Sequence, residues 1–251
     1  AWNYLHLKLS NFTAPQLTDW LTARLKCGGA EVEELSALLM TKTLGNPLYV
    51  TQFFRLLKER GIVSQAEGDT QWQWSGAAIR SLPATENIVP LLQMRLQLLS
   101  EQSQALLQWL ACLYAPTSNT LLQQLMQVTD TELEEALGPC LNREFVVRQS
   151  GGLYRIAHDK ILQMVHEHMT AVQKQQAHSV IAACLISDDT TDAYQVAHHL
   201  TEGRLPETPE QLSDYVHFHH QAGLLALRVA SYHQSSRYLQ RCMEYFTAWA
   251  W

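Results

Sequence analysis

The stretch FVVRQSGGLYRI, residues 145–156, decides the fold of the central part of this chain. Its apolar and β-branched residues fall into two short runs, 145–148 and 153–156, which predict two strands. Ser150-Gly151-Gly152 lies between the runs and predicts a tight turn, because glycine readily adopts the positive φ angles that such turns need. We therefore expect an antiparallel β-hairpin at this point.

Helical patterns precede the hairpin near 101–114, 118–127 and 130–142. Three helices followed by a two-stranded hairpin are the order of elements in a winged helix. The candidate recognition helix, 130–142, carries four carboxylates: Asp130, Glu132, Glu134 and Glu135. DNA contact needs Lys and Arg at such positions. We therefore expect a winged helix that packs against protein, with no nucleic-acid partner.

From His158 onward the pattern is helical, with breaks at Ser187-Asp188-Asp189 and at 203–206, and Asp159 is expected to cap the first of these helices. The last two helices, near 209–226 and 230–247, resemble a helical-hairpin repeat. One such pair cannot bury its own apolar face, so further repeats are expected to follow in a longer parent protein.

Two further helices, over 30–43 and 47–60, lie upstream and are separated by a break. Gly45 can take the left-handed position after the first helix. Asn46 can cap the second, and Pro47 suits its first position, where the missing N–H has no partner in any case. The tripeptide is thus at least a helix boundary.

Shorter signals complete the pattern. The alternation over Tyr4–Leu9 favours a strand, and Thr13 is placed to cap a helix. Runs at 62–64 and 71–74 flank Glu67-Gly68-Asp69 and predict a second small hairpin. A helix is expected near 85–99. The predicted fold class is mainly α, with small β-hairpins.

Composition excludes several classes of protein. Hydrophobic residues make up 47% of the 251 residues, which is too many for a disordered chain, and the net charge of −6 gives no basic field for nucleic acid or anionic membrane. Five separated cysteines favour a reducing compartment, so we expect a cytoplasmic protein. No apolar run reaches the roughly 20 residues of a membrane helix, and no membrane contact is expected.

Several ordered segments resemble the STAND-type AAA ATPases of large bacterial signalling proteins, which often also carry a serine/threonine kinase, GAF domains and a histidine kinase. The main one is TKTLGNPLYVTQF, residues 41–53. The others that agree in order and spacing are QWQW at 71–74, ENIV at 86–89 with MRL at 94–96, LYRIAHDKILQ at 153–163, and QAG at 221–223 with Ala226, Ala230 and Tyr238-Leu239 beyond it.

The resemblance implies a particular organisation. Residues 1–10 would be the last strand of the NTPase core, 11–84 a helical lid with a hairpin, 85–170 a winged-helix domain, and 171–251 the start of a TPR-like array. The phosphate-binding sequence G-x-x-x-x-G-K-(S/T) is absent from the chain, as is an acidic Walker B strand. We therefore expect a fragment downstream of the nucleotide-binding core.

The same resemblance implies a candidate binding site. The resemblance implies that Gly45, Asn46 and Pro47 meet the nucleotide, with the proline near the adenine base, so ATP or ADP would bind in the intact parent and no cofactor in isolation. The plain alternative is a helix boundary only. No catalytic residue is assigned, because His158-Asp159 has no nucleophile in place.

No metal site is assigned either, because neither His166-Glu167-His168 nor His217-Phe218-His219-His220 completes a ligand set. The histidine pair His198-His199 is likewise expected to be packed or at the surface.

Three functions remain distinguishable. The first is the regulatory portion of a STAND-type signalling ATPase, whose lid closes on the upstream nucleotide core and whose repeats bind a protein partner or signalling domain. The alternative is a winged-helix DNA-binding transcription regulator with a helical effector domain, against which the acidic helix 130–142 argues. An independent enzyme is disfavoured, because no phosphate loop, metal set or nucleophile is assembled.

Overall fold

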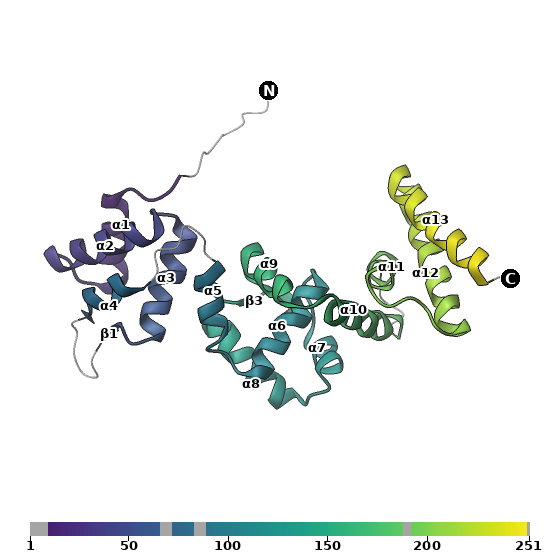
Figure 1. The fold of residues 1–251 in the computed structure, drawn as a ribbon, viewed down its shortest axis with the longest axis horizontal. Coiled ribbons are helices and arrows are strands. Elements are labelled where there is room, and N and C mark those ends of the chain that lie inside the picture. The colour runs from purple at the N-terminus through teal and green to yellow at the C-terminus, as the bar shows by residue number, and fades with distance from the viewer. Residues whose placement is uncertain (1–9, 66–71, 83–88, 188–191, 250–251) are drawn as a thin grey trace, which may run out of the picture. The chain divides into compact units, whose positions relative to one another are not determined.

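The computed structural model describes residues 10–65, 72–82, 89–187 and 192–249, with side chains described as far as Tyr245. Within these ranges the chain is mainly helical, with two small antiparallel hairpins, so the expected fold class is confirmed (Figure 1). The strand predicted over Tyr4–Leu9 and the turn at 67–69 lie outside the described residues.

The chain divides into two compact units, residues 1–99 and 100–251. The boundary lies between Leu99 and Ser100, so the helix that ends at Leu96 lies in the first unit.

Three helices build most of the first unit: α1 (Ala14–Leu25), α2 (Ala30–Thr43) and α3 (Pro47–Glu59). The cap predicted at Thr13 is present as a capping box with Gln16. α1 packs on α2 and α2 on α3, and their fully buried faces are rich in leucine and phenylalanine. These faces form the core of the unit by removing apolar surface from water.

A small hairpin and a short helix complete this unit. β1 (Val63–Gln65) pairs with β2 (Trp72–Trp74) in antiparallel register, Val63 opposite Trp74. α4 (Gly76–Ser81) follows and was not predicted, because six residues are too few to display a helical period. Its N-cap is Ser75, and the Lys42 ammonium donates to the carbonyl oxygens of Arg80 (2.9 Å) and Leu82 at its end.

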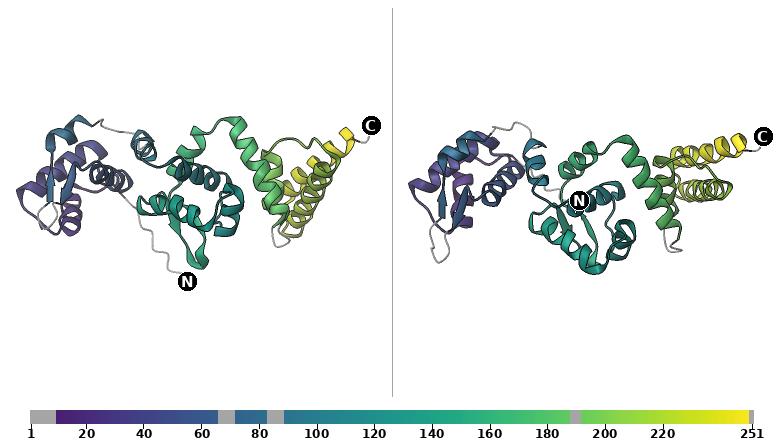
Figure 2. Two further views of the ribbon diagram at one scale, coloured as in Figure 1. Left: turned by 90° about the horizontal axis from the view of Figure 1, so that it is seen from below. Right: turned by 60° about the horizontal axis from the view of Figure 1, so that its bottom comes forward.

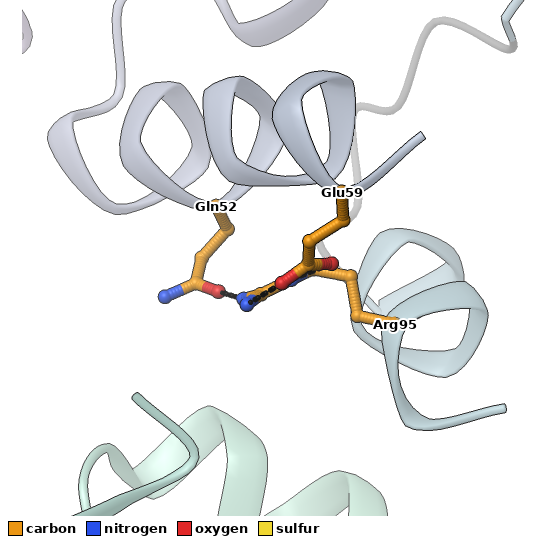
Figure 3. A network of polar contacts seen from close by, with 3 residues as sticks. All are labelled: Gln52, Glu59 and Arg95. Carbon is orange, nitrogen blue, oxygen red and sulfur yellow. Dashed lines mark hydrogen bonds and ion pairs between the residues drawn. The ribbon is translucent and has the colours of Figure 1, made fainter. Parts of the chain in front are cut away.

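The last helix of the first unit, α5 (Val89–Leu96), is joined to α3 by a buried arginine (Figure 3). Arg95 is fully buried. Its Nη2 lies 2.7 Å from Glu59 Oε1 and its Nε 3.1 Å from Oε2, and Nη1 donates to Gln52 Oε1. This bidentate pair satisfies a charge that would otherwise be costly to bury.

The second unit begins with the winged-helix order of elements that the sequence predicts. The helices are α6 (Glu101–Leu113), α7 (Asn119–Met126) and α8 (Asp130–Asn142), followed by β3 (Val146–Arg148) and β4 (Tyr154–Ile156). β3 and β4 are antiparallel, with Val146 opposite Ile156, and a 3₁₀ turn at Ser150–Gly152 with positive φ at Gly151 and Gly152 joins them.

A third backbone segment joins the hairpin. Thr117 and Tyr154 exchange two backbone hydrogen bonds of 2.8 Å, so the segment between α6 and α7 lies along the outer side of β4. Such a short extra strand ties the hairpin to the helices through backbone groups that would otherwise lack partners.

Five helices follow in order: α9 (Asp159–His168), α10 (Ala171–Ile186), α11 (Ala193–Glu202), α12 (Pro209–Arg228) and α13 (Tyr232–Trp249). From α10 onward each packs on the next, and Figure 2 shows α12 and α13 side by side at the green-to-yellow end of the chain. The expected cap at Asp159 is wrong by one residue: His158 Nδ1 accepts the Lys160 N–H, and Asp159 occupies the first turn. No helix among the described residues has the length and apolar character needed to cross a bilayer.

Candidate functional site

The predicted site Gly45-Asn46-Pro47 forms the junction between α2 and α3. Asn46 is the N-cap of α3, and its Oδ1 accepts hydrogen bonds from Leu48 N (3.0 Å) and Tyr49 N (3.3 Å). Pro47 is the first helical residue and its ring is exposed. The tripeptide therefore has the helix-boundary role that the sequence predicts.

Gly45 is needed at this junction for two reasons. Its φ is +72°, a conformation that residues with a Cβ rarely adopt. A Cβ here would also collide with the Phe12 carbonyl oxygen, because Phe12 N donates to Gly45 O at 2.7 Å. The segment before α1 is thus held against the start of α3.

This geometry limits what the junction can bind. A helix N-terminus attracts anions through its free N–H groups. Here Asn46 already occupies two of them and Pro47 has none, so the junction is poorly suited to phosphate. The exposed Pro47 ring offers an apolar contact instead.

The pair α12–α13 is a second candidate, as a protein-binding repeat. The residues of this pair follow the spacing of the tetratricopeptide pattern W-x₂-L-G-x₂-Y…A-x₃-F. The matching positions are His219, Ala222, Gly223, Ala226, Ser235 and Leu239, and several of these side chains are smaller than those of the pattern. A Cβ on Gly223 would lie 2.8 Å from Leu239 Cγ and Cδ2. The two helices therefore approach more closely than a side chain at residue 223 would allow.

A polar groove of about 480 Å³ lies between α11 and α13. α11 contributes His198 and Glu202, and α13 contributes Arg237, Arg241 and Glu244. Charges of both signs in one groove favour a polar or charged protein segment over an apolar one.

The outer side of α8 presents the acidic residues noted in the sequence. Asp130, Glu132, Glu134 and Glu135 are all exposed. Glu132 also completes a capping box with Thr129, whose backbone N–H and hydroxyl bond to Oε2 at 2.8 Å, and these bonds lower the pKa of Glu132. The helix thus carries carboxylates where contact with a phosphate backbone would need cations.

The histidines of the second unit differ in role. His219 is fully buried, stacks on Tyr215 at 4.0 Å between ring centroids, and donates from Nδ1 to the Tyr215 carbonyl oxygen at 2.7 Å. His166 Nε2 lies 2.8 Å from the Tyr114 hydroxyl. His217 and His220, the pair considered for a metal, are both exposed on α12.

One arrangement was missed by sequence reasoning. His178 of α10 meets His198 and His199 of α11. Only the packing of α10 on α11 brings them together, and the doublet His198-His199 was the one signal in the sequence.

Comparisons with known proteins give limited similarity. No protein-family model matches the chain. Over 147 residues, 58% of this chain, the sequence is 22% identical to hybrid signal transduction histidine kinase G of Dictyostelium discoideum, and the match covers 4% of that protein.

A solved structure, a STAND protein with a tetratricopeptide repeat sensor from Pyrococcus horikoshii, is 14% identical with a TM-score of 0.47, over 95% of this chain and 35% of that one. The chain thus spans a minor part of each relative.

Proposed function

We propose that this chain is the regulatory and partner-sensing portion of a larger STAND-type signalling ATPase. The observation that carries the proposal is the α12–α13 pair, whose tetratricopeptide spacing and close contact at Gly223 make it a unit of a helical array. Such arrays recognise protein segments along extended surfaces. The polar groove between α11 and α13 supplies a surface of that kind.

The first unit fits the role of a lid on an upstream nucleotide-binding core. Its exposed Pro47 ring at a rigidly capped helix start suits an apolar contact with the base of ATP or ADP, while the phosphates and Mg²⁺ would be held by the upstream core. The sequence similarity to a signal transduction histidine kinase supports a signalling context. A cytoplasmic location is part of the proposal.

The test is a titration of labelled ADP against the full-length parent protein and its Pro47→Ala variant. Losing a small apolar contact should weaken ADP binding by about fivefold, on the order of 1 kcal/mol. Pro209→Ala is the matched control, because Pro209 also opens a capped helix, α12, with its ring exposed. It should leave ADP affinity unchanged.

If the folded Pro47→Ala variant of the parent protein binds ADP with unchanged affinity, the junction between α2 and α3 is a helix boundary and does not contact the nucleotide. The alternative function is tested separately with duplex DNA at low salt. Salt-dependent binding tighter than micromolar by this chain would favour a transcription regulator, although the exposed carboxylates of α8 oppose it.

A further inference from the structure

Three histidines of the second unit present ring nitrogens to one another. His178 lies on α10, and His198 and His199 lie on α11. One nitrogen from each ring is within 4.8 Å of the other two, and His178 Nδ1 is 2.8 Å from His199 Nδ1. We refer to these three residues as the histidine cluster.

The packing of α10 on α11 fixes the cluster. His178 and His199 are 3% and 2% exposed, and their ring centroids are 5.0 Å apart. His198 is partly exposed, and its ring meets that of His178 edge-on at 5.7 Å. Two of the three rings are therefore held in place by the core, and the third closes the cluster from the solvent side.

The contact between His178 Nδ1 and His199 Nδ1 is a hydrogen bond, so one of these nitrogens carries a proton and the other presents its lone pair. For a metal ion to bind both nitrogens, that proton must move to the other ring nitrogen of the same imidazole, which gives the second neutral tautomer.

One side of the cluster faces open space. A cavity of about 960 Å³ is lined by His178, His198, Tyr114 and Glu202 among others. Glu202 follows His198 by one turn of α11, and its carboxylate favours positive charge near His178. Lys174, one turn before His178, also lines the cavity and opposes a cation, so the two charges offset each other at its edge.

Tyr114 covers another side of the cluster. Its ring is stacked on His178 at 6.5 Å with an interplanar angle of 23°, and meets His198 edge-on at 5.9 Å. Its hydroxyl is bonded to His166 at 2.8 Å. These ring contacts come from the C-cap residue of α6 and restrict the orientation of both imidazoles, as supporting residues do around metal ligands.

We propose that the histidine cluster binds a divalent transition-metal ion of the zinc class through three imidazole nitrogens, with a fourth position open to the cavity. Three protein ligands and one exchangeable position are a common arrangement for Zn²⁺, and imidazole also suits Cu²⁺ and Ni²⁺. With Zn–N bonds of about 2.0–2.1 Å, tetrahedral ligands lie about 3.3 Å apart. The distance of 2.8 Å between His178 Nδ1 and His199 Nδ1 is shorter than that value, and all three ligand atoms lie within 4.8 Å of one another, so ring movements of about an ångström are needed.

A bound ion would join α10 to α11 beside the polar groove between α11 and α13. His198 lines that groove as well as the cavity, so occupancy would fix the position of its side chain in the groove. The metal site stands independently of the proposed ATPase context, because it needs only residues of the second unit.

The experiment uses the full 251-residue chain without an affinity tag, freed of metal by chelator dialysis. Co²⁺ is titrated while its visible absorption is recorded, and Zn²⁺ affinity is measured by competition with a chromophoric chelator. We expect about one ion per chain, the intense visible bands of four-coordinate Co²⁺, and displacement of Co²⁺ by Zn²⁺.

Two variants assign the ligands. His198→Gln, at the partly exposed member, should stay folded by circular dichroism and weaken Zn²⁺ binding by at least about tenfold, and His178→Gln should do the same. His220→Gln is the matched control, an exposed histidine on α12, and should bind as the unaltered chain does.

Two results would overturn the proposal. One is a folded, metal-free chain that shows no Zn²⁺ binding up to about 100 μM, above the range of specific sites. The other is a folded His198→Gln variant that binds Zn²⁺ with unaltered affinity and spectrum. Either would leave the cluster as three packed rings.

Discussion

At the scale of single residues, the first unit depends on a charge placed in its core. Arg95 is completely buried, while its partner Glu59 keeps 16% of its side chain exposed. The guanidinium bonds to both carboxylate oxygens and to Gln52, so its donors find partners on one face of α3. The pair links α5 to α3, because removing either side chain would leave the other charged group without its ion-pair partner.

Replacing Arg95 with Ala should lower the free energy of unfolding of the first unit by about 3 kcal/mol. The loss comes from a cavity and from an unpaired Glu59. The measurement is urea dependence of hydrogen exchange in α3 and α5. Arg80→Ala is the control, because the Arg80–Glu34 pair is 3.7 Å long with side chains 61% and 58% exposed, and should cost under about 0.5 kcal/mol. Equal effects of the two variants would contradict a structural role for the buried pair.

His219 should make the second unit sensitive to acid. Burial lowers its pKa to about 4, with the Arg241 charge on α13 acting in the same direction and the hydrogen bond to Tyr215 opposing it. Its Nδ1–H donates to Tyr215, which leaves Nε2 to accept from the Thr201 hydroxyl. Because the folded pKa is below the unfolded value of about 6.5, the neutral ring stabilises the fold above pH 6.5, and this contribution is lost as the pH falls towards 4.

The expected contribution is on the order of 2–3 kcal/mol between pH 6.5 and 4. Unfolding midpoints of the chain and of His219→Gln, measured across this pH range, should differ in slope, with the variant less dependent on pH. His217→Gln, at an exposed position two residues earlier, should keep the original slope. Parallel curves for the chain and His219→Gln would show that His219 does not titrate with unfolding.

At the scale of elements, the helices of the second unit form successive pairs whose contacts depend on small residues. Gly223 of α12 faces Leu239 of α13, and the buried Ser235 and Cys242 lie on the same stretch of α13. Small side chains at a helix interface let the backbones approach, and this permits a repeat to stack on the next one. α12 and α13 therefore form a closely packed pair and not two independent surface helices.

Replacing Gly223 with Val should destabilise the α12–α13 pair by about 2 kcal/mol, because a larger side chain must displace Leu239. Hydrogen exchange of amides in these two helices reports the change. Gln221→Val provides the control on the same helix, since Gln221 is exposed and the substitution should cost only its lower helix propensity, less than about 0.7 kcal/mol. A Gly223→Val chain as stable as the control would mean that the helices can separate without loss.

At the scale of the whole molecule, the chain divides between Leu99 and Ser100 into two compact units, and each has its own buried core. The first unit is a helical cluster with one hairpin, and the second begins with three helices and a hairpin and continues as packed helices. Because each unit has its own core, a substitution in the core of one unit should leave the structure of the other unaltered.

The isolated chain should hydrolyse neither ATP nor GTP above background, because the sequence carries no phosphate loop to hold the nucleotide and its Mg²⁺. Phosphate release is measured after two rounds of purification, with the heat-denatured sample as control. Turnover that persists through purification and disappears when a residue of this chain is substituted would contradict the prediction.

The local structure of this protein follows from short stretches of its sequence. Thr13 and Asn46 mark helix starts, Gly45 ends a helix, and Ser150-Gly151-Gly152 forms a hairpin turn, each in the position expected. These features depend on backbone conformation and on hydrogen bonds over at most four residues, so neighbouring residues suffice to specify them. The order of three helices and a hairpin follows from them in turn.

Only the tertiary structure decided which distant residues meet. Arg95 finds Glu59 across 36 residues, and His178 finds His199 across 21. The periodicity of a helix indicates which of its faces is buried but not which helix covers that face or at what angle. The histidine cluster and the buried ion pair are set by the packing of α10 on α11 and of α5 on α3, which depends on the shapes of whole helix surfaces.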